Sequence, residues 1–378
     1  MLEFLTHGLT YIVPFLVILT VLVFVHEFGH YFIARRNGVR VEVFSIGFGP
    51  EMFGWRDRAG TRWKFSTVPL GGYVKMFGDS DPSSGLPARS LALAPAERNV
   101  SFHYKRLGQR AAIVAAGPAA NFLFAVLVLA VLFTTYGQPF TPPEVGQVQP
   151  GSAAQQGGVL PGDVILSIDG RAVERFEDLQ QIVRLNPGVP MSVVVRRDGR
   201  EQTLRVTPSR TELSDRFGNH YQIGLLGITH SGMDYVKRDP ANAIIQAGAE
   251  TWGLSVSTLK AMWQIVKGTR ASGELGGPLR IAQMSGEVAQ GGIVAVLWFM
   301  AVLSINLGLI NLFPVPVLDG GHLLFYAAEA VRGKPLGQRA QEYGFRIGLA
   351  LVLTLMVFAT WNDLVHLRIV EFVRSLVT

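Results

Sequence analysis

Four long stretches that are almost free of charge dominate the hydrophobic pattern of this chain. They cover about Leu9–Ala34, Ala111–Thr134, Ile293–Phe313 and Tyr343–Trp361. A helix needs about 20 mostly apolar residues to cross the hydrocarbon core of a bilayer, so each stretch predicts one membrane-spanning helix. The fourth span is admissible if the charged end of Arg346 extends to the membrane interface.

The charged residues between the predicted spans indicate their orientation. Residues 35–110 contain 13 Lys and Arg against 6 Asp and Glu, and the segment between the third and fourth spans is also basic. Because loops rich in Lys and Arg face the cytoplasm, both segments are expected on the cytoplasmic side. Four spans with both termini outside satisfy this expectation, and the region between the second and third spans is then extracytoplasmic.

A fifth apolar segment, Pro240–Val266, is interrupted by Glu250 and Lys260. If this segment crossed the membrane, the basic stretch after the third span would move to the outside, against the charge rule. We therefore predict one or two amphipathic helices on the outer surface within residues 231–291.

Residues 137–230 have the pattern of a compact α+β domain. The run Leu160–Gly170, L-P-G-D-V-I-L-S-I-D-G, places a short hydrophobic strand between two turns. A helix over Phe176–Leu185 and strands over Met191–Arg197 and Glu201–Val206 are expected to follow. The segment resembles one PDZ domain, a fold that binds extended peptides along a sheet edge. Peptide binding and a purely steric gate over the membrane portion both remain open.

Composition supports a membrane protein and limits the chemistry. Hydrophobic residues make up 49% of the chain and charged residues 16%, with a mean hydropathy of +0.30. The net charge of +6 is explained by basic cytoplasmic loops and requires no nucleic-acid partner. The chain has no cysteine, so any metal must be bound by His, Asp or Glu. The first apolar stretch lacks two features of a cleaved signal peptide: a basic region before it and a small-residue cleavage site after it. We therefore expect this stretch to be retained.

The first span ends in His26-Glu27-Phe28-Gly29-His30, which matches the pattern H-E-x-x-H. Residues four apart share one face of a helix, so His26 and His30 can bind one Zn²⁺, with Glu27 beside them as general base. Ionisable residues inside a membrane span are costly and are usually functional. The alternative is a polar cluster at a helix end that lipid headgroups and water satisfy.

A carboxylate after the third span is predicted to complete the metal site. Two prolines, Pro314 and Pro316, break the helix near the membrane face, and Asp319 follows them. The first and third spans run in the same direction, so Asp319 should lie at the depth of the two histidines. Two histidines and one carboxylate leave a catalytic zinc an open position for water. His322 is the competing third ligand, and a plain turn residue is the alternative role for Asp319.

The two motifs together resemble those of the site-2 protease family of intramembrane metalloproteases, in the bacterial branch of the regulator of sigma-E protease. The resemblance covers nearly the whole chain. It implies that His26, His30 and Asp319 are zinc ligands and that Glu27 is the catalytic glutamate. It also implies that Asn311 holds the substrate backbone.

Two further stretches extend this resemblance. Gly117-Pro-Ala-Ala-Asn121 is similar to the family motif G-x-x-x-N, and its asparagine should hydrogen-bond to another helix, an active-site loop or a substrate, with plain helix packing as the alternative. Arg62–Met76 is predicted to form a β-hairpin with its turn at Gly71-Gly72. The resemblance implies a re-entrant β-loop that pairs with unwound substrate, and the alternative is a surface hairpin without substrate contact. The candidate substrate-binding residues are Asn311, Asn121, Gly71, Gly72, Pro314 and Pro316.

The expected fold is an α-helical polytopic membrane protein with four transmembrane helices, a membrane-associated β-hairpin region on the cytoplasmic side and one extracytoplasmic PDZ domain. The expected localisation is the bacterial cytoplasmic (inner) membrane. The expected segments are the first span (1–34), a cytoplasmic loop (35–110), the second span (111–136), the PDZ domain (137–230), surface helices (231–291), the third span with its motif (292–322), a cytoplasmic loop (323–342) and the fourth span with the tail (343–378).

The expected function is that of a zinc endopeptidase that cleaves the membrane-spanning segments of single-span proteins. By resemblance, the substrates are anti-sigma factors trimmed by an earlier protease and remnant signal peptides. The expected partners are these substrates, the lipid bilayer and a peptide or substrate ectodomain at the PDZ domain, with no nucleic acid. The alternatives are an inactive PDZ-containing membrane adaptor and a metal transporter. The transporter is disfavoured because the interiors of the second, third and fourth spans offer no carboxylate or histidine.

Overall fold

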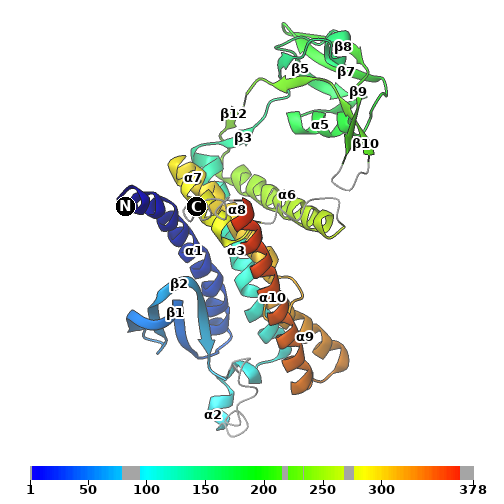
Figure 1. Ribbon diagram of the computed structural model, residues 1–378. Coiled ribbons are helices and arrows are strands. Elements are labelled where there is room, and N and C mark those ends of the chain that lie inside the picture. The colour runs from blue at the N-terminus through cyan, green and yellow to red at the C-terminus, as the bar shows by residue number, and fades with distance from the viewer. Residues whose placement is uncertain (1, 79–93, 215–219, 233, 268–275, 367–378) are drawn as a thin grey trace, which may run out of the picture. The chain divides into compact units, whose positions relative to one another are not determined.

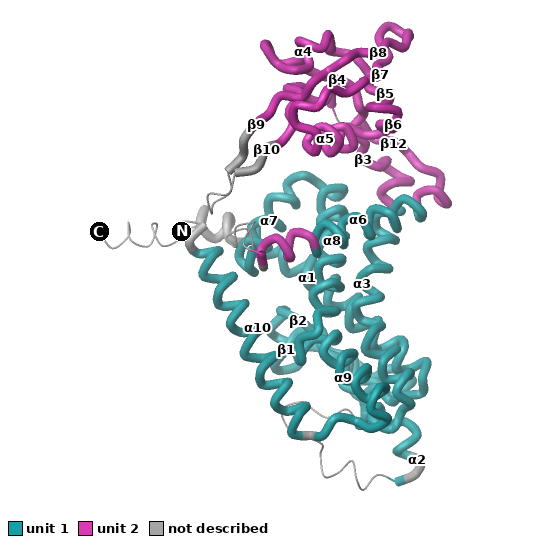
Figure 2. The backbone as a smooth tube through the Cα atoms, turned by 90° about the vertical axis from the view of Figure 1, so that its right-hand side faces the viewer, with its two compact units in different colours: residues 1–130, 244–259, 273–378 teal, residues 131–243, 260–272 magenta. Residues whose placement is uncertain are grey.

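The computed structural model describes residues 2–78, 94–214, 220–232, 234–267 and 276–366. The chain forms two compact units (Figures 1 and 2): unit 1 comprises residues 1–130, 244–259 and 273–378, and unit 2 comprises residues 131–243 and 260–272. The helices are α1 (Leu2–Arg36), α2 (Pro95–Arg98), a 3₁₀ helix (Phe102–Tyr104), α3 (Leu107–Thr135), α4 (Ala153–Gln156), α5 (Phe176–Arg184), α6 (Pro240–Val266), α7 (Pro278–Gln290), α8 (Ile293–Asn311), α9 (Asp319–Arg332) and α10 (Gln338–His366). The strands are β1 (Val41–Arg56), β2 (Arg62–Met76), β3 (Gln138–Phe140), β4 (Val145–Val148), β5 (Val164–Ile168), β6 (Arg171–Ala172), β7 (Met191–Arg197), β8 (Arg200–Val206), β9 (Ser209–Ser214), β10 (His220–Leu225), β11 (Ile228–His230) and β12 (Asp234–Val236).

Four helices are long and apolar enough to cross a membrane, as predicted. These segments are Thr10–Arg36 in α1, Leu107–Thr135 in α3, Ile293–Asn311 in α8 and Arg339–Leu364 in α10. Helix α6 is not among the four found within the described residues, which agrees with the prediction that it is not a span.

Helix α6 has the burial pattern of an amphipathic helix. Its buried positions recur every fourth residue, which places them on one face: Ala243, Ala247, Thr251 and Ser255. Large apolar side chains on the helix are exposed, among them Ile245, Trp252 and Trp263. The position of α6 on the outer surface stays a prediction.

The membrane portion of unit 1 is held together by close contacts of α1 with α3 and α8. Ile18 and Leu22 of α1 form a buried apolar cluster with Phe299 and Met300 of α8. On α1, Gly29 lies directly against α3, because a Cβ atom there would overlap a backbone carbonyl of that helix. Small residues allow such close approach between membrane helices. The C-terminal half of α1 is thereby packed against α3 (Figure 1).

Strands β1 and β2 form a sheet beside α1 (Figure 1), in which residues 53–56 and 62–65 are the arms of an antiparallel hairpin. The chain reverses after Asp57, whose carboxylate accepts hydrogen bonds from the amides of Ala59 and Thr61, both at 2.9 Å. The same carboxylate accepts a hydrogen bond of 3.0 Å from the hydroxyl of Tyr31 on α1. Asp57 therefore both closes the turn and attaches the hairpin to the helix that carries H-E-x-x-H.

The prediction that residues 62–76 form a β-hairpin by themselves, with its turn at Gly71-Gly72, is wrong. Both glycines lie inside β2, at an irregularity where Ile46 pairs with Gly72 but Phe48 pairs with Val68. The two ends of this segment do not pair with each other: residues 72–76 pair with residues 41–46, whereas residues 62–65 pair with residues 43–46 and with residues 53–56. Glycine marks bulges inside strands as well as turns, and its presence alone does not distinguish them.

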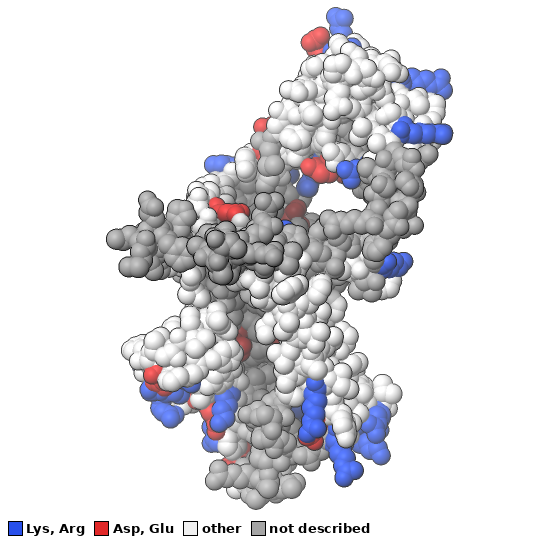
Figure 3. All heavy atoms as spheres, in the orientation of Figure 1, with Lys and Arg blue, Asp and Glu red and all other residues white. Residues whose placement is uncertain are grey.

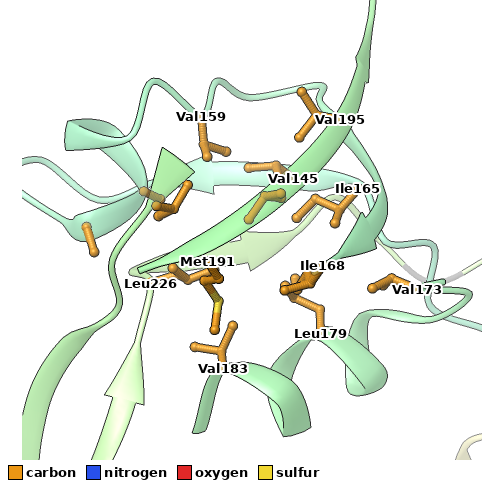
Figure 4. Close-up of a cluster of buried hydrophobic side chains, with 14 of the residues drawn as sticks. Val145, Val159, Ile165, Ile168, Val173, Leu179, Val183, Met191, Val195 and Leu226 are labelled. Atoms are coloured by element: carbon orange, nitrogen blue, oxygen red, sulfur yellow. The ribbon is translucent and has the colours of Figure 1, made fainter. Parts of the chain in front are cut away.

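Unit 2 contains a four-stranded sheet in the order β6-β5-β7-β8. The predicted helix and strands after residue 160 are confirmed as α5, β5, β7 and β8. Leu179 and Val183 of α5 pack against Ile165 and Ile168 of β5 and Met191 of β7 in one buried cluster (Figure 4). Along β7 buried and more exposed residues alternate, as the period of a strand requires. The identification of this region as a PDZ domain stays a prediction.

The turn that leads into β5 is organised by a buried carboxylate. Asp163 accepts hydrogen bonds from the amide of Leu160 at 2.9 Å and from the guanidinium of Arg197 at 2.7 Å. Burial acts to raise the pKa of Asp163, but these hydrogen bonds outweigh it and hold the pKa of the carboxyl below its ordinary value. The carboxylate is therefore charged at neutral pH and keeps the turn closed.

Candidate active site

Helix α1 brings two imidazoles together, one turn apart. The Nε2 atoms of His26 and His30 are 3.2 Å apart, and their ring centroids are 4.8 Å apart. His30 is buried and His26 is partly buried. The i, i+4 spacing predicted from the sequence therefore places both nitrogens at one point inside unit 1.

The carboxylate of Asp319 reaches the same point from a distant part of the chain. Asp319 is the first residue of α9, and its Oδ2 lies 3.2 Å from Nε2 of His26 and 3.5 Å from Nε2 of His30. The predicted convergence of the two motifs is thus present in the structure. His322, the competing ligand, lies one turn further along α9. It does not belong to the group of metal-binding side chains found among the described residues.

The loop between α8 and α9 follows a tight and partly strained path. Pro314 and Pro316 lack the N–H that a helix would need and prevent α8 from continuing. Cβ atoms at Gly320 or Gly321 would overlap backbone atoms of this loop. Val317 has a φ of 122°, which β-branched residues rarely adopt. Such strain persists only where the surrounding structure imposes it, and it is concentrated at functional sites.

The three converging atoms have the spacing of a zinc site. With zinc–ligand bonds of about 2.0–2.1 Å in a tetrahedron, two ligand atoms lie about 3.3 Å apart. The observed separations are 3.2, 3.2 and 3.5 Å. Oδ2 of Asp319 is buried and, among the described residues, has no hydrogen-bonding neighbour other than the imidazoles of His26 and His30, which is costly for a carboxylate unless a cation binds it. Two imidazole nitrogens and one carboxylate oxygen therefore fit zinc and leave a fourth position open.

Glu27 is held beside this group by strand β2. Its carboxylate accepts a hydrogen bond from the backbone of Val74 and lies within electrostatic reach of both histidines and Asp319. Two residues earlier on β2, Gly72 leaves no room for a side chain. A Cβ atom there would lie 2.7 Å from the carbonyl of Ser45 and 3.3 Å from Cγ of Glu27. The hairpin therefore contributes directly to the position of the candidate general base.

We predict that Gly72→Ala lowers the rate of peptide cleavage by about 10–100-fold while zinc remains bound. The new methyl group would displace Glu27 or open β2, and a misplacement of about 1 Å in a catalytic group costs up to about 100-fold. Single-turnover rates and zinc content of the purified protein would measure this. Gly108→Ala is the matched control, because nothing lies within 4 Å of a Cβ atom there. A Gly72→Ala protein with the wild-type rate would contradict this placement of β2.

Three of the predicted substrate-binding residues come shortly before Asp319 in the sequence, and a fourth lies beside β1. Asn311, the last residue of α8, is partly exposed, and Pro314 and Pro316 follow it in the loop that leads to Asp319. Gly71 has a φ of 135°, and a Cβ atom there would overlap the ring of Phe48. Substrate contact by these residues stays a prediction.

Asn121 is placed differently from the other predicted substrate-binding residues. It is fully buried in α3, and its Nδ2 lies 3.1 Å from Nδ1 of His26. Its side chain therefore faces a candidate metal ligand. The sequence predicted that Asn121 hydrogen-bonds to another helix, an active-site loop or a substrate. In the structure its neighbour is another helix, α1.

Backbone groups complete the site, and the sequence pattern did not predict them. Nδ1 of His30 lies 2.9 Å from the carbonyl of Ile113 on α3, and the amide of Val74 on β2 holds Glu27. Every residue type except proline carries these groups, so no side chain announces them. Gly117, one turn after Ile113, belongs to the G-x-x-x-N motif. This glycine was the only sign in the sequence that the backbone of α3 lies close to another part of the site.

Comparison with known proteins identifies relatives over almost the full length of the chain. The model of "Peptidase family M50" matches residues 14–355. A Rhizobium meliloti (strain 1021) protein named as a zinc metalloprotease is 50% identical, covering 94% of this chain and 97% of its own length. "Protease RseP" of Yersinia pestis is 33% identical, covering 92% of this chain and 97% of its own length. Among solved structures, the HtrA3 PDZ domain bound to a phage-derived ligand is 32% identical over 18% of this chain and 62% of that chain, with a TM-score of 0.16.

Proposed function

Because the chain belongs to peptidase family M50, the site-2 protease family, we propose that it cleaves the membrane-spanning segments of other proteins. It is a zinc metalloprotease, as its relatives are named, and its four apolar helices are those of a membrane protein. One observation carries the proposal. His26, Glu27 and His30 lie on a helix that is long and apolar enough to cross a membrane, and Asp319 joins them there.

In the proposed mechanism, His26, His30 and Asp319 hold the metal and Glu27 moves the proton. A zinc ion bound there supplies an activated water and polarises the carbonyl of the bond to be cut. Glu27 accepts a proton from the water and returns it to the leaving nitrogen. The backbone amide of Val74 keeps the Glu27 carboxylate in position for both transfers.

The hairpin is proposed to receive the substrate after it unwinds. Peptide bonds in a membrane helix are hydrogen-bonded within the helix and covered by side chains, so they must be released before hydrolysis. Residues 72–76 of β2 pair with residues 41–46 of β1 on one side only, so their other edge is covered by no described strand. Pairing of an extended substrate along such an edge would present its carbonyls in regular order. Since β2 contacts Glu27, a strand paired there lies close to the proposed base.

The surface of the hairpin supports its contact with lipid. Several large apolar side chains of β1 and β2 are exposed. Exposure of so many apolar groups to water is unfavourable, whereas contact with lipid would bury them. These side chains are Phe48, Met52, Phe53, Trp55, Val68 and Leu70. We propose that this face enters the membrane and that the substrates are single-span proteins, such as trimmed anti-sigma factors and remnant signal peptides. Asn311, Pro314 and Pro316 are the proposed contacts to the substrate backbone.

The charge distribution of unit 1 supports a cytoplasmic position for the hairpin. Lys and Arg side chains gather at the lower end of this unit in Figure 3, where Figure 1 places the hairpin, α9 and the end of α1. Exposed members of this group are Arg35 and Arg36 on α1 and Arg332 on α9. Basic residues at one end of a set of spans favour the cytoplasmic side. We therefore propose insertion in the bacterial inner membrane, with the PDZ domain outside.

The proposal is tested with the purified full-length protein in lipid vesicles that also contain a single-span substrate protein. We expect two fragments whose new ends lie within the span, no cleavage after a chelator removes zinc, and recovery when zinc is restored. Cuts confined to the soluble parts of the substrate would contradict intramembrane cleavage. Substrate binding without any cleavage at full zinc content would favour the adaptor.

A further inference from the structure

One face of α3 lines the two histidines from Ile113 to Asn121. Ile113, Gly117 and Asn121 are spaced four residues apart and therefore lie on the same side of the helix. The carbonyl of Ile113 is 2.9 Å from Nδ1 of His30, and Nδ2 of Asn121 is 3.1 Å from Nδ1 of His26. The Nδ1 atom of each candidate metal-binding histidine thus lies against α3.

Gly117 makes this arrangement sterically feasible. It lies between the two contacts, and a Cβ atom there would overlap Nε2 of His30 and lie 2.8 Å from Cε1 of His26. The backbone of α3 therefore touches both imidazoles where the glycine leaves room. The spacing G-x-x-x-N places the asparagine about one turn further, where Nδ1 of His26 lies.

Asn121 is enclosed on its other side by α8. The hydroxyl of Ser304 donates a hydrogen bond of 2.9 Å to the backbone carbonyl of Asn121. A Cβ atom at Gly308 would lie 3.4 Å from Cβ of Asn121. Asn121 has no exposed surface, so a substrate cannot reach its side chain without separation of these helices.

The chemistry of a metal-binding histidine defines what Asn121 must do. A neutral imidazole that binds a metal through Nε2 carries its proton on Nδ1 and needs an acceptor there. Oδ1 of Asn121 is buried without a hydrogen-bond partner among the described residues. A half-turn of the amide about its last side-chain bond exchanges Nδ2 and Oδ1 without moving the residue. The acceptor then faces Nδ1 of His26.

We propose that Asn121 is a positioning residue of the metal site: its amide oxygen accepts the Nδ1 proton of His26 and thereby leaves Nε2 free to bind zinc. The carbonyl of Ile113 does the same for His30. The G-x-x-x-N segment of α3 is therefore the outer support of both histidines. This inference rests on the proposed ligand set and replaces the expected substrate contact of Asn121.

Zinc affinity of full-length variants tests the proposal independently of activity. Outer partners of metal-binding histidines contribute about 10–100-fold to metal affinity. We expect Asn121→Leu, which keeps the volume but offers no acceptor, to weaken zinc binding by that factor in competition with a chromogenic chelator. Asn121→Asp retains an acceptor and should remain within about threefold of wild type. Thermal unfolding of the zinc-free proteins shows that each variant is folded.

Ser304→Ala is the matched control, because it removes the hydrogen bond between α8 and Asn121 but leaves the amide in place. Its zinc affinity should stay within about twofold of wild type. Unchanged affinity of Asn121→Leu, while Asp319→Asn loses zinc, would overturn the inference and leave the ligand set intact. Equal losses in Asn121→Leu and Asn121→Asp would also overturn it. Zinc retained by Asp319→Asn would instead overturn the ligand set itself.

Discussion

Replacing Glu27 by Gln is expected to lower the rate of cleavage by about 10²–10⁴-fold while leaving zinc bound. Glutamine keeps the size and the hydrogen-bond acceptor that faces Val74, but it cannot accept a proton from water at neutral pH. A positioned general base contributes about 10²–10⁴-fold to the rate, so a loss in that range is expected. Single-turnover cleavage of a single-span substrate in vesicles and the zinc content of the same sample measure the two effects separately.

Glu342→Gln serves as the control for Glu27→Gln. Glu342 is exposed on α10, where it pairs with Arg346, and its replacement should leave both rate and zinc content unchanged. Wild-type cleavage by Glu27→Gln would show that another group is the base. In cells, the membrane-protein fragments that accumulate with Glu27→Gln would identify the natural substrates.

Asp319→Asn is expected to remove the third ligand and with it the zinc. Its Oδ2 lies within 3.5 Å of both imidazole nitrogens, and an amide oxygen is a much weaker zinc ligand than a carboxylate. Because outer partners already contribute about 10–100-fold to metal affinity, loss of a direct ligand should weaken binding by more than about 100-fold. Zinc content after gel filtration should fall from about one per chain to near zero, and cleavage should stop.

The matched variant for Asp319→Asn is His322→Ala. His322 was the competing ligand, and it lies on the same helix but outside the converging group. Its replacement should leave zinc content unchanged. If His322→Ala lost zinc and Asp319→Asn retained it, the choice between the two ligands would have to be reversed.

The membrane helices could be predicted because the bilayer imposes a simple rule on sequence. Apolar runs of about 20 residues are required to cross it, and the four predicted runs agree with the four helices found. Pro240–Val266, which Glu250 and Lys260 interrupt, is not among these four helices of the described residues, and its position outside the membrane stays a prediction. In unit 2, alternation and turn residues located β7 and α5 for the same kind of local reason.

The hairpin could not be predicted to the same degree, because strand pairing is decided by non-local contacts. The Gly71-Gly72 pair is as compatible with a bulge as with a turn, and only the pairing with β1 determines which one forms. The consequence for function is direct. The pairing of residues 72–76 with residues 41–46 places Gly72 against Glu27.

By itself, the sequence determined the chemistry of this protein: H-E-x-x-H on an apolar helix and a carboxylate after a proline-broken span predict a zinc centre within a membrane. Only the tertiary structure decided how that centre is supported. The carbonyl of Ile113, the amide of Val74 and the enclosed amide of Asn121 each lie against a side chain of the candidate site from another element. The physical reason is that two of these groups belong to the backbone, which is the same in nearly every residue, and the third acquires its role from the imidazole that α1 places beside it.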